Sequence, residues 1–299
     1  MWRPDCLAAA IRAVRDHYGA EPREVTIEAN PTDCTDANLA AWRGAGVSRV
    51  SIGVQALDAP ALVVLGRDHR FGDGRAAVER SLAAGFTTSA DFILGTPGGS
   101  SRVETLAADH LSVYELTIED RTAFGKRVRD GRLVPLDEDA LTELYTQTHD
   151  QLTGAGFEHY EISSYARPGQ RAVHNSLYWQ GSPFLGLGVG AASLEVHPDG
   201  SGMRATNPRR AKDYLAAPGV PVERTTMAAS EMAIDRAWLG LRTSDGVAEA
   251  DLAPARGIAE ELVGRGLAER RGGRICPTLR GFLMADGIAA RIVQSWGTQ

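Results

Sequence analysis

The sequence predicts an α/β protein, with a parallel sheet of the (β/α) barrel or partial-barrel type followed by a smaller α-rich module. In the first half, short β-rich runs alternate with amphipathic helical patterns, at about 25–30 residues per unit. The β-rich runs are largely apolar, as in a sheet covered by helices. From about residue 226 the pattern changes to helix, helix, hairpin and helix, which is typical of a winged-helix module.

The elements of the first half follow from local signals. Pro4 suits the first turn of a helix, Thr35 can cap one, and Gly85 can end one. The predicted helices cover residues 4–18, 35–43, 59–65, 74–84 and 137–155. The predicted strands cover residues 25–28, 49–55, 88–94, 111–117 and 159–163. Between Gly95 and His110 only a short helix of about two turns fits.

The last third is a different module. Helices are predicted at 227–241 and 254–262, a hairpin at 267–276 that turns at Gly272-Gly273, and a helix at 277–293. Three domains are expected: a barrel domain over 1–165, a connecting segment over 166–225, and a winged-helix-like domain over 226–299.

Composition excludes several classes of protein. A net charge of −6 argues against a nucleic-acid binder, and residues 257–262 of the winged-helix pattern include Glu260 and Glu261 where DNA recognition would need basic side chains. The sequence has no apolar run of transmembrane length and no signal-peptide pattern at Met1. Three cysteines, at positions 6, 34 and 276, give no disulfide framework and no local metal knuckle. We therefore expect a cytoplasmic protein.

The run His174-Asn175-Ser176-Leu177-Tyr178-Trp179 combines an imidazole, a carboxamide and two large aromatic side chains. Histidine commonly ligates iron and other transition metals, and the aromatic rings offer flat faces to a planar ligand. The alternative is a loop that tucks two aromatic side chains into a core and leaves His174 hydrogen-bonded. The six residues by themselves leave both interpretations open.

Polar side chains stand at the predicted carboxyl ends of four strands: Glu28, Gln55, Asp91 and Glu119. In parallel (β/α) folds these ends meet at one edge of the sheet, where the chemistry is placed. This pattern predicts a site at that edge. The alternative is a polar network that only closes the mouth of the barrel.

Seven ordered runs carry a family resemblance that covers nearly the whole chain. They are residues 26–31, 51–55, 65–67, 91–97, 114–119, 160–163 and 174–179. With them, the chain resembles the radical-SAM coproporphyrinogen dehydrogenase family, and most of all its heme-chaperone branch (HemW type). The resemblance implies a radical-SAM partial (β/α) barrel with a C-terminal winged-helix-like domain, and a role in heme trafficking or porphyrin biosynthesis.

The resemblance also implies roles for particular residues. His174 matches an axial ligand of heme iron, with Asn175 orienting it and Tyr178 and Trp179 flanking the macrocycle; Arg167 or Arg171 would pair with the propionates. Four further positions match residues that contact S-adenosylmethionine (SAM), namely Glu28, Gln55, Arg67 and Asp91. The implied partners are heme and a heme-accepting protein, and the resemblance is compatible with transient contact with a membrane protein.

The cluster region of the family has no counterpart in this sequence. Family members begin with two strands, a Cys-x-x-x-Cys-x-x-Cys loop that holds a [4Fe–4S] cluster, and a glycine-rich turn. Met1 falls just past that region, and Cys6, Cys34 and Cys276 are too far apart to replace it. We therefore expect a partial barrel without its first two strands, and heme binding without radical chemistry. The alternative is an N-terminally truncated form of a radical-SAM [4Fe–4S] enzyme of porphyrin biosynthesis.

Overall fold

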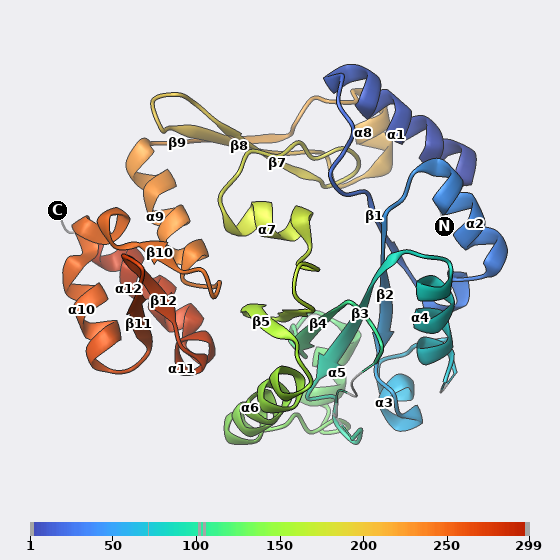
Figure 1. Ribbon diagram of the computed structural model, residues 1–299, viewed down its shortest axis with the longest axis horizontal. Helices are drawn as coiled ribbons and strands as arrows, with labels where there is room; N and C mark the ends of the chain where they lie inside the picture. Colours follow the sequence, from blue (N-terminus) through green and yellow to red (C-terminus); the bar gives the residue numbers. More distant parts are fainter. Residues whose placement is uncertain (1–2, 71, 101–102, 104–105, 297–299) are drawn as a thin grey trace. The chain divides into compact units, whose positions relative to one another are not determined.

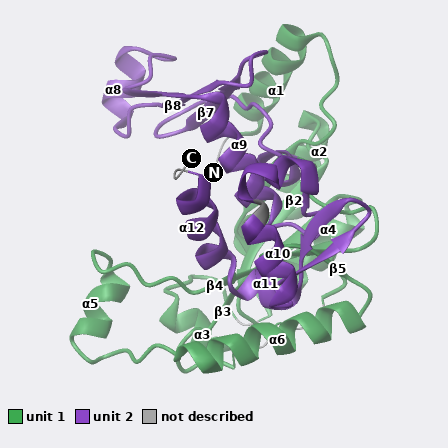
Figure 2. Cartoon of the chain, turned by 90° about the vertical axis from the view of Figure 1, so that its left-hand side faces the viewer, with its two compact units in different colours: residues 1–173 green, residues 174–299 purple. Residues whose placement is uncertain are grey.

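The computed structural model describes residues 3–70, 72–100, 103 and 106–296 (Figure 1). These residues form two compact units, unit 1 over residues 1–173 and unit 2 over residues 174–299 (Figure 2).

Unit 1 is built on a six-stranded sheet with the order β1-β2-β3-β4-β6-β5. Its strands are β1 (Thr26–Ala29), β2 (Arg49–Gln55), β3 (Thr87–Leu94), β4 (His110–Glu115), β5 (Glu158–Glu161) and β6 (Ser164–Ala166). Strands β1 to β4 are parallel, with Glu28 opposite Ser51 and Asp91 opposite Ser112. The α/β class and the first four strands are confirmed.

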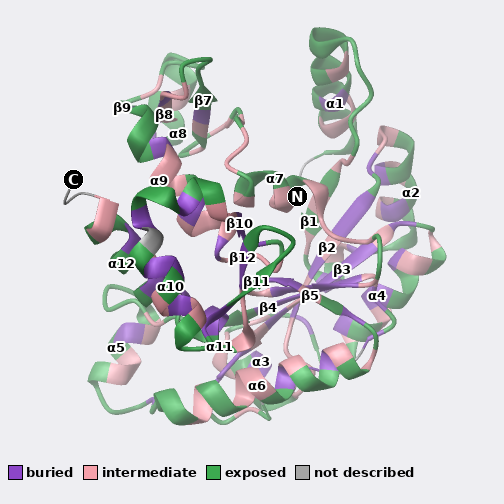
Figure 3. Ribbon diagram, turned by 60° about the vertical axis from the view of Figure 1, so that its left-hand side comes forward, coloured by how far each residue is buried: buried purple, intermediate pink, exposed green. Residues whose placement is uncertain are grey.

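Helices pack against one face of this sheet, with α4 on β2 and β3, and α6 on β3 and β5. The helices of unit 1 are α1 (Pro4–Tyr18), α2 (Asp36–Ala45), α3 (Ala59–Val64), α4 (Asp73–Ala83), α5 (Ala123–Arg129) and α6 (Glu138–Gly154), with a 3₁₀ turn over Pro31–Asp33. The core between them contains Trp42, Ile52, Phe92, Leu111 and Leu152, all at most 2% exposed. Figure 3 shows this burial along the central strands.

The end of the sheet corrects the sequence prediction. The predicted strand 159–163 covers β5 and the turn after it, whereas β6 was not predicted. Both β4–β6 and β6–β5 pairings are antiparallel. The sheet is therefore mixed. The chain reverses at Ile162-Ser163, and an antiparallel pair needs no crossover helix between its strands.

Two loops also differ from the prediction. The described residues between Leu94 and His110 form turns and bends instead of a short helix; residues 101–102 and 104–105 of that predicted helix lie outside the described part. Glu119 lies beyond the end of β4 at Glu115, in an exposed turn before α5.

Unit 2 holds two small antiparallel sheets. The first has the order β7-β8-β9, from β7 (Ala192–Val196), β8 (Gly202–Thr206) and β9 (Glu223–Met227). The second has the order β10-β12-β11, from β10 (Val247–Ala248), β11 (Ala268–Arg271) and β12 (Arg274–Pro277). The helices are α7 (Val173–Trp179), which starts at the last residue of unit 1, α8 (Ala211–Ala216), α9 (Ala229–Gly240), α10 (Arg256–Gly264), α11 (Leu279–Leu283) and α12 (Ala285–Trp296), with a 3₁₀ segment over Glu249–Ala255.

The predicted hairpin at 267–276 is confirmed as β11 and β12, and α9 and α10 match their predicted helices. The predicted single helix 277–293 is instead two helices, because the first ends at Met284. The sheet β7-β8-β9 has no counterpart in the prediction. Within the described residues, no helix combines the length and apolar character that crossing a bilayer would require.

Candidate functional site

One face of the unit 1 sheet is polar. Along each parallel strand the apolar residues face the helices, and every second residue points to the opposite face. That second set contains Glu28 on β1, Arg49 and Ser51 on β2, Ser89 and Asp91 on β3, and His110, Ser112 and Tyr114 on β4. A face with this many ionisable groups is suited to hold a polar ligand.

Asp91 lies near the middle of this face. Ser51 donates a hydrogen bond to its carboxylate, at 3.1 Å to Oδ1 and 3.0 Å to Oδ2. Burial raises the pKa of Asp91 to about 6, against the opposing effect of hydrogen bonds from Ser112 and Ser51. The charge of Glu28 raises this pKa further and that of Arg49 lowers it. Asp91 is therefore poised to change charge near neutral pH, and Glu28 lies close enough to influence it.

Replacing Ser51 with alanine is expected to raise the pKa of Asp91 above about 6, because a hydrogen bond that favours the carboxylate is lost. The titration of the Asp91 carboxyl carbon, followed by NMR, measures this directly. Ser48→Ala is the matched control, since Ser48 bonds the backbone of Val25 and not Asp91. An Asp91 that titrates at its ordinary value in the unmodified protein would contradict the predicted shift.

Gln55 ends β2 in a left-handed backbone conformation, with φ of 65°. This conformation disfavours a residue with a side chain and indicates a local constraint. The pairing of β2 with β3 shifts register between Ile52 and Gln55. A Cβ atom at Gly53 would lie 2.6 Å from Gln55 Nε2, so the absence of a side chain at Gly53 leaves room for the Gln55 amide.

The four residues predicted to contact SAM are thus only partly brought together. Glu28 and Asp91 share the polar face, and Gln55 lies at the end of β2, opposite Phe92. Arg67 follows α3, outside the sheet strands that carry the other three residues. The SAM-binding role of all four stays a prediction.

The run from His174 to Trp179 forms helix α7, where the sequence suggested a loop. The four-residue spacing puts His174 and Tyr178 on one helical face, where their rings meet edge to face at 4.8 Å between centroids. Tyr178 in turn packs edge to face on Phe184, at 4.6 Å. His174 and Tyr178 are exposed, the latter by 38%. An exposed imidazole backed by two rings fits a planar ligand with a metal at its centre.

The other residues of the motif are less well placed for the predicted roles. The buried Nε1 of Trp179 has no acceptor among the described residues. Arg167 stacks over Phe157 at 3.9 Å, and Arg171 pairs with Glu158 at 3.3 Å. Both arginines therefore already have partners in unit 1, and their predicted pairing with propionates is untested.

Several residues of these sites escaped the sequence prediction. Arg49, Ser51, Ser112 and Tyr114 could have been found, because they alternate with apolar residues along strands that were assigned correctly. Phe184 lies outside any local pattern, so only the folded chain places it against Tyr178.

The cysteines do not fit a radical-SAM cluster, which needs three thiolates on one loop. Cys34 is buried in unit 1 and Cys276 in unit 2, whereas Cys6 is exposed. Burial raises the pKa of the Cys34 thiol to about 11, which disfavours the thiolate that ligates iron. Among the described residues, no three His, Cys, Asp or Glu side chains are grouped as metal ligands.

The radical SAM superfamily model matches residues 3–107. The heme chaperone HemW of Mycobacterium tuberculosis is 35% identical over 299 residues, which cover 96% of this chain and 76% of that protein. The chain belongs to the HemW-type radical-SAM family. The heme chaperone HemW of Escherichia coli is 35% identical over 205 residues, covering 66% of this chain and 53% of that protein.

Structure comparison agrees with membership of this HemW-type family at the level of the fold. The E. coli coproporphyrinogen III oxidase HemN, a radical SAM enzyme, superposes with a TM-score of 0.74 over 97% of this chain and 74% of its own. At 19% identity this likeness shows a shared α/β fold with a mixed sheet and helices. The resemblance seen in the sequence is therefore confirmed for the family.

Proposed function

We propose that this chain binds heme through His174 and passes it to an acceptor protein, as a heme-trafficking member of the HemW-type family. The observation that carries the proposal is the arrangement of His174, Tyr178 and Phe184, which joins an exposed imidazole to two aromatic rings. A carrier must release its ligand, and an exposed site on a short helix suits reversible binding.

The residues present fit heme in a specific way. His174 would ligate the iron through a neutral imidazole nitrogen, and Tyr178 would pack beside the macrocycle. The indole ring of Trp179 is proposed to flank the macrocycle together with Tyr178. Asn175 is proposed to help orient the imidazole. When bound, the heme itself would supply the iron, and the chain's own contribution is to hold it.

The test is a heme titration of the purified chain beside His174→Ala. We expect the wild type to give a Soret band typical of histidine ligation, and the variant to bind at least about tenfold more weakly with a shifted band. Replacing His197, an exposed histidine on the turn between β7 and β8, with alanine is the control and should change neither. Identical spectra and affinities for wild type and His174→Ala would overturn the proposal.

We also propose that this chain, with the cysteines it has, performs no radical-SAM chemistry. Weak residual SAM binding would involve Glu28 and Asp91 on the polar face, with Gln55 and Arg67 from outside that face. The positions and burial of Cys6, Cys34 and Cys276 support the absence of a cluster. The match of the radical SAM model favours a second candidate, in which this chain is part of a longer radical-SAM enzyme. An in-frame Cys-x-x-x-Cys-x-x-Cys upstream of Met1 in the genomic DNA would favour that candidate.

The finer architecture is part of the same proposal. We propose that the six-stranded sheet is part of a (β/α) barrel, supported by the parallel pairing of β1 to β4 and by the helices α4 and α6 that pack on it. The helices α9, α10 and α12 with the hairpin β11–β12 support a winged-helix-like domain over residues 226–299. The boundaries at 165/166 and 225/226, the heme acceptor and the cytoplasmic location stay predictions.

A further inference from the structure

We infer that Glu24 and Arg49 are positioning residues of the heme site, because their buried ion pair holds the backbone that leads directly into His174. This inference rests on the proposed heme function of His174. The contacts of Glu24 and Arg49 are with other groups of unit 1, among them the backbone of Gln170 and Val173. They act through residues 170–173, the last segment of unit 1.

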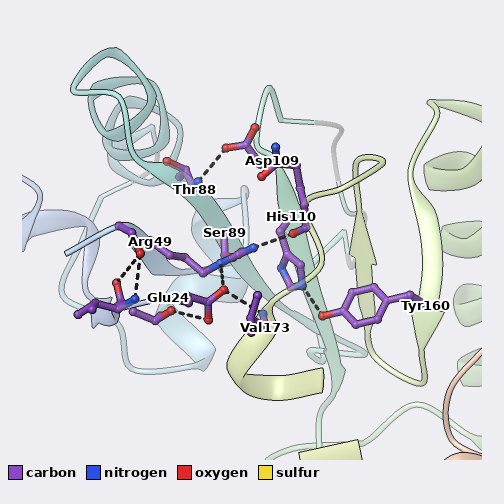
Figure 4. Close-up of polar contacts among 12 residues, drawn as sticks. Glu24, Arg49, Thr88, Ser89, Asp109, His110, Tyr160 and Val173 are labelled. Carbon is purple, nitrogen blue, oxygen red and sulfur yellow. Dashed lines mark hydrogen bonds and ion pairs between the residues drawn. The ribbon is translucent and has the colours of Figure 1, made fainter. Parts of the chain in front are cut away.

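The side chains of Glu24 and Arg49 are buried, and both make several hydrogen bonds besides their ion pair (Figure 4). Arg49 Nε lies 3.2 Å from Glu24 Oε2, and the two side chains are only 4% and 9% exposed. Arg49 Nη1 also donates to Ser89 Oγ at 2.7 Å, and Thr26 Oγ1 donates to Glu24 Oε1 at 3.0 Å. A buried pair with its remaining positions hydrogen-bonded has a fixed geometry, since moving it would leave charges unpaired.

Both members of the pair reach the chain just before α7. Arg49 Nη2 donates to the carbonyl oxygen of Gln170 at 2.6 Å. The backbone N–H of Val173 donates to Glu24 Oε2 at 2.9 Å. Val173 is the first residue of α7, and the first N–H groups of a helix have no partner within the helix. Glu24 therefore caps α7 from a distant part of the chain, with a charge that favours a helix N-terminus.

These two contacts matter for His174 because the segment before α7 has no helix or strand that would fix its backbone. Residues 167–172 between β6 and α7 form turns and irregular structure. The hydrogen bonds from Arg49 and to Glu24 involve backbone atoms of Gln170 and Val173. They therefore hold the backbone of this segment independently of its side chains. Val173, which Glu24 holds, is the first residue of α7, and His174 is the next residue of the same helix.

The sharpest test removes one N–H without disturbing the helix. Val173→Pro eliminates the bond to Glu24, and proline is well tolerated as the first residue of a helix. Val173→Ala is the matched control, because it removes the valine side chain but keeps the N–H. Each full-length variant is titrated with hemin, and amide hydrogen exchange is followed in residues 174–179.

We expect Val173→Pro to remain folded, to bind hemin about three- to tenfold more weakly than Val173→Ala, and to exchange faster in α7. A Glu24→Gln variant should show the same two changes if it folds, because it keeps an acceptor but loses the charge. Equal affinity and equal exchange in the proline and alanine variants would overturn the inference. Failure of the wild type to bind hemin would instead sink the proposed function, and the exchange comparison would still decide whether the pair positions α7.

Discussion

Replacing Arg49 with alanine is expected to lower the free energy of unfolding of unit 1 by about 3–5 kcal/mol, because it leaves the carboxylate of Glu24 buried without its cation. The change also removes the donors to Ser89 and to the carbonyl of Gln170. The central strands should report the loss most directly. Native-state hydrogen exchange of the β2 and β3 amides at increasing urea measures it in the full-length chain.

The double variant Arg49→Met with Glu24→Leu separates the buried charge from the other contacts. It removes both members of the pair and fills the space with apolar side chains. The double variant should therefore lose clearly less free energy of unfolding than the sum of the losses of Arg49→Met alone and Glu24→Leu alone. Losses that simply add would mean that the two residues act independently. That outcome would contradict the account of a coupled pair.

The sequence was enough to place the sheet of unit 1 because its strands combine strong β-propensity with clear boundaries. In β2, for example, buried Val50, Ile52 and Val54 alternate with less buried residues, and Gly44 and Gly46 mark the end of the preceding helix. The reversal at Ile162-Ser163 was missed because the predicted strand ran through these two residues to Ser163, and β6, with only three residues, was not predicted. Register and direction depend on pairing, which a local pattern does not contain.

The candidate site was only partly predictable for the same reason. Glu28 and Asp91 could be placed on one edge, since parallel strands bring their ends together. The ion pair of Arg49 with Glu24, 25 residues away, and the bond to Gln170, 121 residues away, are products of the tertiary fold. The sheet β7-β8-β9 was missed although Leu194 and Met227 are buried in it, because its strands are short and mostly exposed.

Acidification is expected to destabilise unit 1 below about pH 6.5, because two buried histidines resist protonation. Burial lowers the pKa of His110 to about 3, helped by the charge of Arg49. Burial likewise lowers the pKa of His159 to about 3, with a smaller effect of His149, whose Nδ1 lies 2.9 Å from its own. The unfolded chain binds these two protons below about pH 6.5 and the folded chain does not until about pH 3. Stability is therefore highest above pH 6.5 and falls as the pH drops towards 3.

The slope of the free energy of unfolding against pH should change between pH 6.5 and 3, because the protonation of Asp91 stabilises the folded chain where that of the histidines stabilises the unfolded chain. With a pKa raised to about 6, Asp91 is protonated in the folded chain while the unfolded chain is still ionised down to about pH 4. Between about pH 6 and 4 one of the two histidine protons is thus offset, so these three groups together contribute a slope of about 1.4 kcal/mol per pH unit. Below pH 4 their contribution should rise towards about 2.7 kcal/mol per pH unit. Urea unfolding at a series of pH values measures both regimes.

Two variants test the assignment of this pH dependence. Asp91→Asn removes the opposing group, so the steep slope should extend up to about pH 6, whereas His159→Asn should remove about one proton from the slope at every pH below 6. The two substitutions act on opposite faces of the same sheet, since His159 stacks on the core residue Tyr165 at 4.1 Å and Asp91 belongs to the polar face. Their effects should therefore add. A stability that stays flat from pH 6.5 to 4 in Asp91→Asn would show that the two histidines take up protons in the folded chain, and that their burial does not hold them neutral.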